Sequence, residues 1–367
     1  MRGLYIHIPF CIKKCEYCDF ISYTDCYDKE KLYLAAMVEE FKQYEDKQVD
    51  TVYIGGGTPS SLSTEGLIFL MDKIFEYFDV TEDAEITMEV NPKTADMQKL
   101  KALRLSGVNR LSIGVQSFCD DELNRIGRIH TAKDAQNCIL DAKFAGFKNI
   151  SVDLMFGLPK QTVESYRNSL IAAVAAGVNH ISAYSLILEE GTPLYDKVQN
   201  WEMRLPTEAV EAAMYDTTCE VLRASGFYQY EVSNFSKTGY ESRHNLKYWE
   251  CEEYIGCGAA AHSYLRGTRF SNHKTIDEYI ANPKERLDKT ELTPKEQMSE
   301  FMFLGLRKTA GVDLQEFECR FINSAYEVYG EAIDKYIKLG LLVHEKGFLR
   351  FTERGMRLSN TVLCEFV

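Results

Sequence analysis

Short apolar runs and helical patterns alternate along the first half of the chain. The apolar runs cover residues 4–8, 51–54, 85–90, 110–116, 149–156 and 180–188. Stretches with apolar residues at helical spacing separate them, at residues 28–45, 64–77, 94–106, 132–145 and 163–176. Repeated strand-then-helix units predict an α/β fold with a parallel sheet, whose strands are apolar throughout because helices cover them.

The alternation alone leaves two architectures open, a partial (β/α)6 barrel and a doubly wound sheet. Polar residues in or at the ends of successive strands favour the barrel, namely Cys11, Gly57, Glu89, Gln116, Asp153 and Tyr184. In barrels of this kind the active site gathers at the C-terminal rim of the strands. We therefore expect a partial TIM-like barrel with a chemical site at that rim.

The second half of the chain follows a different pattern. The alternation breaks at about residue 207, and helical spacing returns at residues 296–307, 314–320 and 326–339. Two short apolar runs then flank Gly347, which predicts a hairpin with glycine in the turn. We expect two domains, a barrel with an extension over residues 1–283 and a helical, winged-helix-like domain over residues 291–367.

Charge and hydropathy limit the partners of the protein. The 367 residues carry a formal net charge of −13, which disfavours nucleic acid as an obligatory partner. Acidic and basic residues are balanced from residue 326 onward, so the winged unit is not expected to bind DNA. No apolar run is long enough to span a bilayer, and no signal peptide precedes the first cysteine. These features predict a cytoplasmic protein.

Three of the eleven cysteines stand close together. Cys11, Cys15 and Cys18 follow the first apolar run at a Cys-x3-Cys-x2-Cys spacing, whereas the other eight are scattered singly. Three thiolates on one loop can ligate three irons of a [4Fe–4S] cluster and leave the fourth iron open for chemistry. A zinc site is the alternative for this spacing taken by itself.

Two motifs together carry a family resemblance. The cysteine loop, with Tyr17 inside it, and the segment Gly55-Gly56-Gly57-Thr58-Pro59 resemble the radical S-adenosylmethionine (SAM) superfamily. Residues 5–11, 109–118 and 153–159 resemble the oxygen-independent coproporphyrinogen III oxidase family, and the likeness covers essentially the whole chain. The resemblance implies a [4Fe–4S] cluster on Cys11, Cys15 and Cys18, and SAM contacts by Tyr5, Tyr17, Gly56, Gly57, Thr58, Glu89, Gln116, Arg128 and Asp153.

The chain departs from the oxidase branch of that family in two places. Phe20 stands where the oxidase has a fourth cysteine, and the sequence has no room before Cys11 for the oxidase's N-terminal extension. Both features are similar to the sister branch, the heme chaperones of the HemW type. That branch also carries a His-Asn-x-x-Tyr-Trp element, present here from His244 to Trp249.

The resemblance to the chaperone branch implies three further properties. Heme or a related porphyrin would be the ligand, His244 would ligate the heme iron, and the recipients would be membrane-bound respiratory enzymes. Two enzyme functions remain as alternatives, oxidative decarboxylation of coproporphyrinogen III and radical SAM chemistry on another substrate. The sequence leaves open whether SAM is cleaved in turnover.

Overall fold

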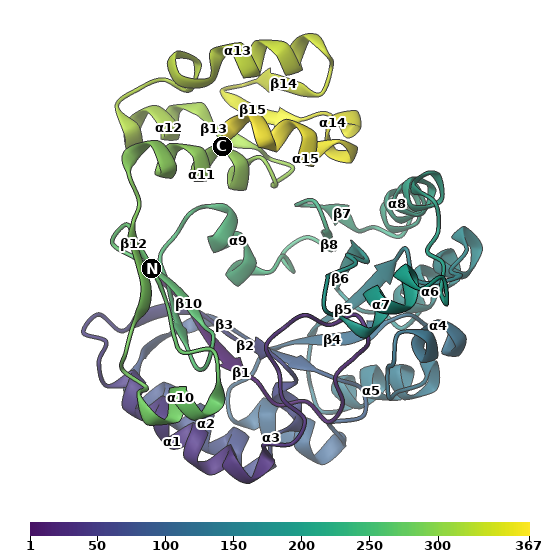
Figure 1. The fold of residues 1–367 in the computed structure, drawn as a ribbon, viewed down its shortest axis with the longest axis vertical. Helices are drawn as coiled ribbons and strands as arrows, with labels where there is room; N and C mark the ends of the chain where they lie inside the picture. Colours follow the sequence, from purple (N-terminus) through teal and green to yellow (C-terminus); the bar gives the residue numbers. More distant parts are fainter.

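A twelve-stranded sheet organises the computed structural model, which describes residues 1–367 (Figure 1). Its order is β12-β11-β10-β9-β1-β2-β3-β4-β5-β6-β8-β7. The six central strands are β1 (Arg2–Ile8), β2 (Gln48–Gly56), β3 (Asp79–Val90), β4 (Arg110–Gln116), β5 (Asn149–Phe156) and β6 (His180–Ser185). Each pairs in parallel with the one before it.

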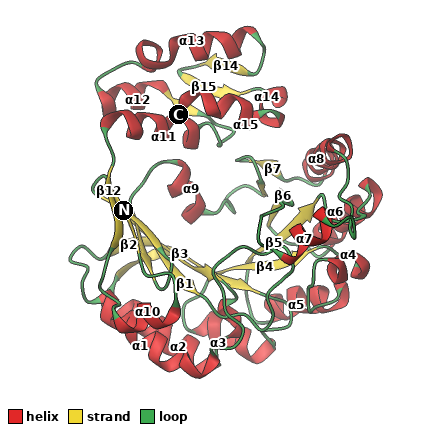
Figure 2. Cartoon of the chain, viewed as in Figure 1, coloured by secondary structure: helices red, strands yellow, loops and turns green.

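Helices between these strands lie along the outer, convex side of the curved sheet (Figure 2). They are α1 (Glu30–Phe41), α2 (Thr64–Tyr77), α3 (Met97–Leu105), α4 (Asp120–Arg125), α5 (Ala132–Phe144) and α6 (Val163–Ala175). Sequential strand order with these helices on the convex side is the arrangement of a barrel, whereas a doubly wound sheet reverses its strand order at a switch point. The partial-barrel prediction is confirmed. The barrel stays open because β1 and β6 pair with different extensions.

Those extensions come from the region where the alternation breaks. On one side β8 (Asn234–Ser236) and β7 (Tyr228–Gln229) follow β6; on the other, β9 (Tyr254–Cys257), β10 (His262–Leu265), β11 (Thr268–Ser271) and β12 (Leu287–Glu291) follow β1. The helices of this region are α7 (Pro193–Gln199), α8 (Glu208–Ala224), α9 (Arg243–Trp249) and α10 (Ile276–Ala281). All of β12 except Glu291 lies between the two expected domains. Its exposed, mostly polar side chains suit a sheet edge and hide the strand from a hydrophobic pattern.

The C-terminal unit has its own hydrophobic core, separate from that of the barrel. It contains α11 (Pro294–Gly305), β13 (Val312–Asp313), α12 (Leu314–Phe321), α13 (Ala325–Lys338), β14 (Leu342–Glu345), β15 (Phe348–Phe351), α14 (Glu353–Arg357) and α15 (Ser359–Leu363). The three strands form a small sheet in the order β13-β15-β14. Helices followed by a hairpin match the winged-helix-like pattern of the sequence. None of the helices of the chain is both long and apolar enough to cross a membrane.

Helix α9 lies between the barrel and the C-terminal unit and covers the N-terminal ends of β2 and β3 (Figure 1). Its first two backbone N–H groups, those of Arg243 and His244, donate to the carboxylate of Glu85 at 3.2 and 3.1 Å. A carboxylate is stabilised there because the N-terminus of a helix carries unpaired N–H groups. On the same helix, Lys247 forms an ion pair with Asp50 at 2.9 Å. The helix therefore closes the barrel at the end opposite to the predicted chemical site.

A buried carboxylate joins the β9–β11 extension to the barrel. Glu40 of α1 is fully buried and accepts hydrogen bonds from Gly258 N at 2.9 Å, from Asn272 Nδ2 at 2.7 Å and from the hydroxyl of Tyr279. Burial raises the pKa of Glu40 to about 7. Three buried donors of this extension, each more than 200 residues from Glu40 in the sequence, thus depend on one side chain.

The Glu40→Ala substitution is expected to lower the free energy of unfolding by about 3 kcal/mol, because it leaves several buried donors unpaired. The matched variant Tyr279→Phe removes one donor and keeps the ring, so it should cost about 1 kcal/mol. Urea unfolding followed by circular dichroism measures both. Equal losses in the two variants would contradict this account of Glu40.

Candidate functional site

The three predicted cluster cysteines lie on one loop that crosses the C-terminal ends of the strands. This loop leaves β1 after Ile8 and is fixed by backbone hydrogen bonds from Cys11 N to Tyr23 O at 2.9 Å and from Tyr23 N to Pro9 O at 2.7 Å. Cys11 is buried, whereas Cys15 and Cys18 are partly exposed. Burial raises the pKa of the Cys11 thiol, and it raises that of Cys18 to about 11.

The glycine-rich segment continues the pairing of β1 and β2 beyond the ends of both strands. Gly57 N donates to Ile8 O at 2.9 Å, and Thr58 N donates to Phe10 O at 2.8 Å. A Cβ atom on Gly57 would lie 2.9 Å from each of these two carbonyl oxygens, so a side chain is excluded there. The hydroxyl of Thr58 lies 3.4 Å from the sulfur of Cys11. The two predicted motifs therefore form one structural unit.

Two carboxylates from β3 and β5, the strands on either side of β4, face the same space. Glu89 of β3 accepts hydrogen bonds from Tyr53 Oη at 2.8 Å and from Gly56 N at 3.2 Å. Removal from bulk water raises the pKa of Glu89 to about 7, and the nearby Asp153 adds to the shift. Asp153 of β5 accepts a hydrogen bond from Ser112 Oγ at 3.2 Å, and burial raises its pKa as well.

Arg128 and Gln116 complete the polar wall beside the cysteines. The guanidinium of Arg128 donates to Cys15 Sγ at 3.4 Å and to the carbonyl of Gly114, while its Nε is buried without a partner. Gln116 ends β4 with a φ of +66°, a left-handed conformation that is strained for a residue other than glycine. Its side-chain oxygen accepts a hydrogen bond from Tyr184 at 2.9 Å.

These side chains enclose a cavity of about 530 Å³. Its lining includes every predicted cluster and SAM residue except Tyr5, namely Cys11, Cys15, Tyr17, Cys18, Gly56, Gly57, Thr58, Glu89, Gln116, Arg128 and Asp153. It also includes Asn91 and Asn234, whose buried side-chain oxygens have no partner. Asn91 directly follows β3, at the same C-terminal rim as Glu89 and Gln116, so position could have identified it. Asn234 comes from the antiparallel extension, and no sequence signal marks it.

The donor set of this cavity fits the cofactors that the sequence predicts. Three thiols lie at one end of the cavity. No three His, Cys, Asp or Glu side chains are close enough together to hold a single metal ion. Carboxylates, an arginine with a free Nε and two unpaired amide oxygens line the rest. Such groups can meet the ammonium, carboxylate and ribose hydroxyls of an amino-acid nucleoside.

Tyr5 lies outside this cavity. Its hydroxyl lies 3.0 Å from Nδ1 of His7, and its ring stacks on Tyr53 with the centroids 6.3 Å apart. Nε2 of His7 lies 3.1 Å from the carbonyl oxygen of Ile21, at the far end of the cysteine loop. In this structure Tyr5 therefore supports residues behind the cavity instead of lining it.

His244 lies at the opposite end of the barrel from the cysteines. It is 1% exposed, and its ring stacks on Tyr53. Both ring nitrogens are engaged, Nδ1 with Thr51 Oγ1 and Nε2 with Tyr248 Oη, each at 2.9 Å. Burial, with Lys247 nearby, lowers the pKa of His244 to about 3. In this conformation the imidazole would have to break one of these hydrogen bonds before it could coordinate iron.

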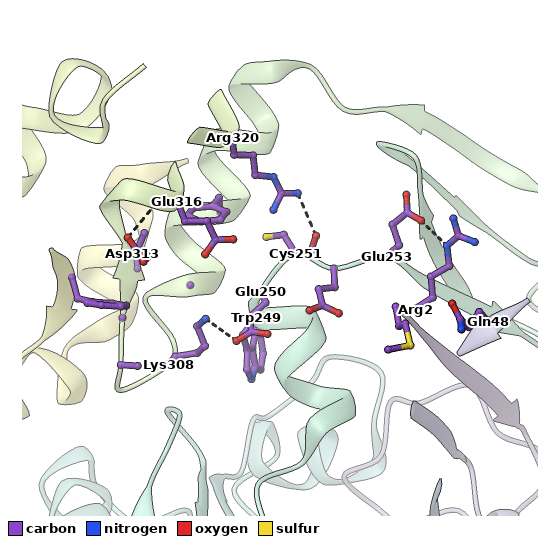
Figure 3. A pocket seen from close by; sticks show the side chains of 18 of the residues that line it. Arg2, Gln48, Trp249, Glu250, Cys251, Glu253, Lys308, Asp313, Glu316 and Arg320 are labelled. Atoms are coloured by element: carbon purple, nitrogen blue, oxygen red, sulfur yellow. Dashed lines mark hydrogen bonds and ion pairs between the residues drawn. The ribbon is translucent and has the colours of Figure 1, made fainter. Parts of the chain in front are cut away.

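A second, larger cavity of about 920 Å³ separates the barrel from the C-terminal unit (Figure 3). Most of its charged side chains are paired, as in Arg2 with Glu253 at 2.6 Å and Lys308 with Glu250 at 3.1 Å. Arg320 points toward Cys251 and donates to its carbonyl at 3.4 Å (Figure 3). None of the predicted site residues lines this space. We interpret it as the polar interface between the two units.

Comparison with known proteins gives the same assignment for both parts of the chain. Residues 5–171 match the radical SAM superfamily, and residues 292–358 match the HemN C-terminal domain. The chain is 41% identical to the heme chaperone HemW of Bacillus subtilis, over 100% of this chain and 99% of that protein. It is 39% identical to the heme chaperone HemW of Lactococcus lactis, over 100% of this chain and 97% of that protein.

One solved structure shares the whole fold. The coproporphyrinogen III oxidase HemN of Escherichia coli, a radical SAM enzyme, superposes with a TM-score of 0.86 over 99% of this chain and 89% of its own. Sequence identity is 24%, so this likeness supports the fold and not the activity.

Replacement of Cys11, Cys15 or Cys18 by alanine is expected to abolish the iron–sulfur absorbance after anaerobic reconstitution, because each removes one of three cluster ligands. The controls are Cys26→Ala and Cys251→Ala, which change cysteines outside the 530 Å³ cavity and should keep the full absorbance. Loss of the cluster in either control would mean that the ligands are assigned wrongly.

Proposed function

Because this chain belongs to the HemW family of radical SAM proteins, we propose that it is a heme chaperone that binds heme and passes it to another protein. Its likeness to curated heme chaperones over the full length of both chains carries this proposal. Phe20 supports it, because the oxidase branch of the family carries a cysteine at this position. We propose that the proteins that receive the heme are respiratory enzymes of the membrane.

The radical SAM fold implies a [4Fe–4S] cluster and SAM. We propose that Cys11, Cys15 and Cys18 hold the cluster, which when bound supplies an electron and an open iron. Gly56 and Gly57 line the cavity, and the absence of side chains there allows His7 and the backbone of the cysteine loop to pack against them. Asp153 and Glu89 offer carboxylates to a cationic ligand, and the guanidinium of Arg128 offers a donor to a carboxylate.

The remaining proposed SAM contacts are those of Tyr17, Thr58 and Gln116, which line the same cavity. Tyr5 would act indirectly, by holding His7 against the end of the cysteine loop. For heme, we propose that α9 takes part through its His-Asn-x-x-Tyr-Trp element. Coordination by His244 itself would require α9 to leave the end of the barrel.

The affinity for SAM is expected to rise with pH through about pH 7. The pKa of Glu89 is raised from its ordinary value to about 7, so its carboxyl is neutral below that pH and charged above it. A charged carboxylate attracts the positively charged ligand. Isothermal titration of the reconstituted protein at several pH values measures this dependence, and Glu89→Gln should remove most of it. An equally steep pH dependence in Glu89→Gln would rule out Glu89 as the titrating group.

Anaerobically reconstituted protein is expected to bind heme and to leave coproporphyrinogen III unchanged. Heme titration by absorbance and chromatographic analysis of the porphyrin products, on the same sample with SAM and a reductant, measure the two properties. The Escherichia coli oxidase serves as the positive control for the assay. Decarboxylation at a rate near that of the control would contradict the chaperone proposal and favour the oxidase. Absence of heme binding would also contradict it.

A further inference from the structure

His262 differs from the other six histidines because neither of its ring nitrogens makes a hydrogen bond. The others each have at least one engaged ring nitrogen, namely His7, His130, His180, His244, His273 and His344. His262 is also exposed, at the start of β10. An accessible imidazole with a free nitrogen is the commonest protein ligand for transition metals.

Aromatic side chains surround His262. It lines an open groove of about 390 Å³ together with Tyr5, Phe20, Tyr248 and Tyr254. Phe20 is 65% exposed, so its ring is accessible to a ligand in the groove. Tyr248 and Tyr254 pack edge to face with their centroids 4.7 Å apart. Flat apolar rings beside a free imidazole suit a planar, apolar ligand that carries a metal ion.

The groove lies next to the cluster cavity and to the heme-chaperone element. Asp19 and Phe20, on the cysteine loop, line both the groove and the cluster cavity. Tyr248, on α9, belongs to the His-Asn-x-x-Tyr-Trp element. The groove is therefore the place where two distinctive sequence features of this chain meet.

We propose that the groove is the heme site and that His262 supplies the axial ligand to the heme iron. This inference rests on the proposed chaperone function and locates its ligand. In this arrangement the rings of Phe20 and Tyr248 contact the macrocycle, and His262 binds the iron through a ring nitrogen. The groove is open, so one face of the heme stays accessible to a recipient protein.

His244 acts in this arrangement as a positioning residue. Its Nε2 holds the hydroxyl of Tyr248 at 2.9 Å, and its other nitrogen is fixed by Thr51. The histidine of the element thus orients the tyrosine at the groove without reaching the iron. Such a role explains how the element can serve heme binding while its histidine remains buried.

The cavity between the two units is a poorer site for heme. It contains the free thiol of Cys251, but carboxylates outnumber cations in its lining. The acidic residues are Asp46, Glu250, Glu252, Glu253, Asp313 and Glu316, against the cations of Arg2, Lys308 and Arg320. Heme carries two propionates, so this charge pattern repels it. In the groove only Asp19 is acidic, and the propionates can remain in solvent.

Heme titration of the full-length reconstituted protein tests the assignment, with the absorbance and electron paramagnetic resonance spectra of the bound heme as the second measurement. His262→Ala should lower heme affinity about tenfold or more and change the axial-ligand signature, which free imidazole should restore. His244→Ala should lower affinity by about fivefold and keep the wild-type signature. His344→Ala, which changes the other exposed histidine, is the matched control and should behave as wild type.

The outcomes separate this inference from the function on which it rests. Wild-type protein that binds no heme would overturn both. Wild-type affinity and spectrum in His262→Ala would overturn the assignment of His262 alone. Loss of the axial-ligand signature in His244→Ala would show that α9 supplies the ligand instead of His262. Its loss in Cys251→Ala would show that heme binds in the cavity between the units. Retained iron–sulfur absorbance in each variant shows that the fold is intact.

Discussion

Backbone pairing between the cysteine loop and the glycine-rich loop is the constraint on which the site depends. The hydrogen bonds from Gly57 N to Ile8 O and from Thr58 N to Phe10 O extend the β1–β2 ladder beyond the strands. They place the thiols over the C-terminal rim, where successive parallel strands deliver Glu89, Gln116 and Asp153. Any side chain at position 57 would push the two loops apart. One close backbone approach therefore assembles the cavity.

The two ends of the barrel are connected through one interior of aromatic and polar side chains. At the closed end, the ring of His244 stacks on Tyr53, and the hydroxyl of Tyr53 donates to Glu89 at the open end. Tyr5 also stacks on Tyr53, and its hydroxyl lies 3.0 Å from Nδ1 of His7. Fully bonded polar groups of this kind are costly to disrupt inside a protein. The same interior side chains therefore hold α9 in place and orient the wall of the cavity.

Strand periodicity predicted a parallel α/β fold, and polar residues at the strand ends favoured a barrel with Glu89, Gln116 and Asp153 at one rim, because parallel strands in sequential order end together. The other predicted cavity residues, such as Tyr17 and Arg128, came from the family resemblance. The directions of side chains could not be predicted in the same way. Tyr5 and His244 belong to recognisable motifs, yet one supports the cavity from behind and the other is enclosed at the opposite end. His262 carries no motif. The pairing of β10 with β9 brings it into one groove with Phe20 and Tyr248.

The most direct test of the account is a crystal structure of the reconstituted protein, grown anaerobically with SAM and heme. We expect a cluster on Cys11, Cys15 and Cys18 with SAM in the 530 Å³ cavity, and heme in the neighbouring groove with its iron on His262. A fourth protein ligand on the cluster would contradict the proposed site. Heme bound elsewhere, with α9 displaced or between the two units, would contradict the proposed groove.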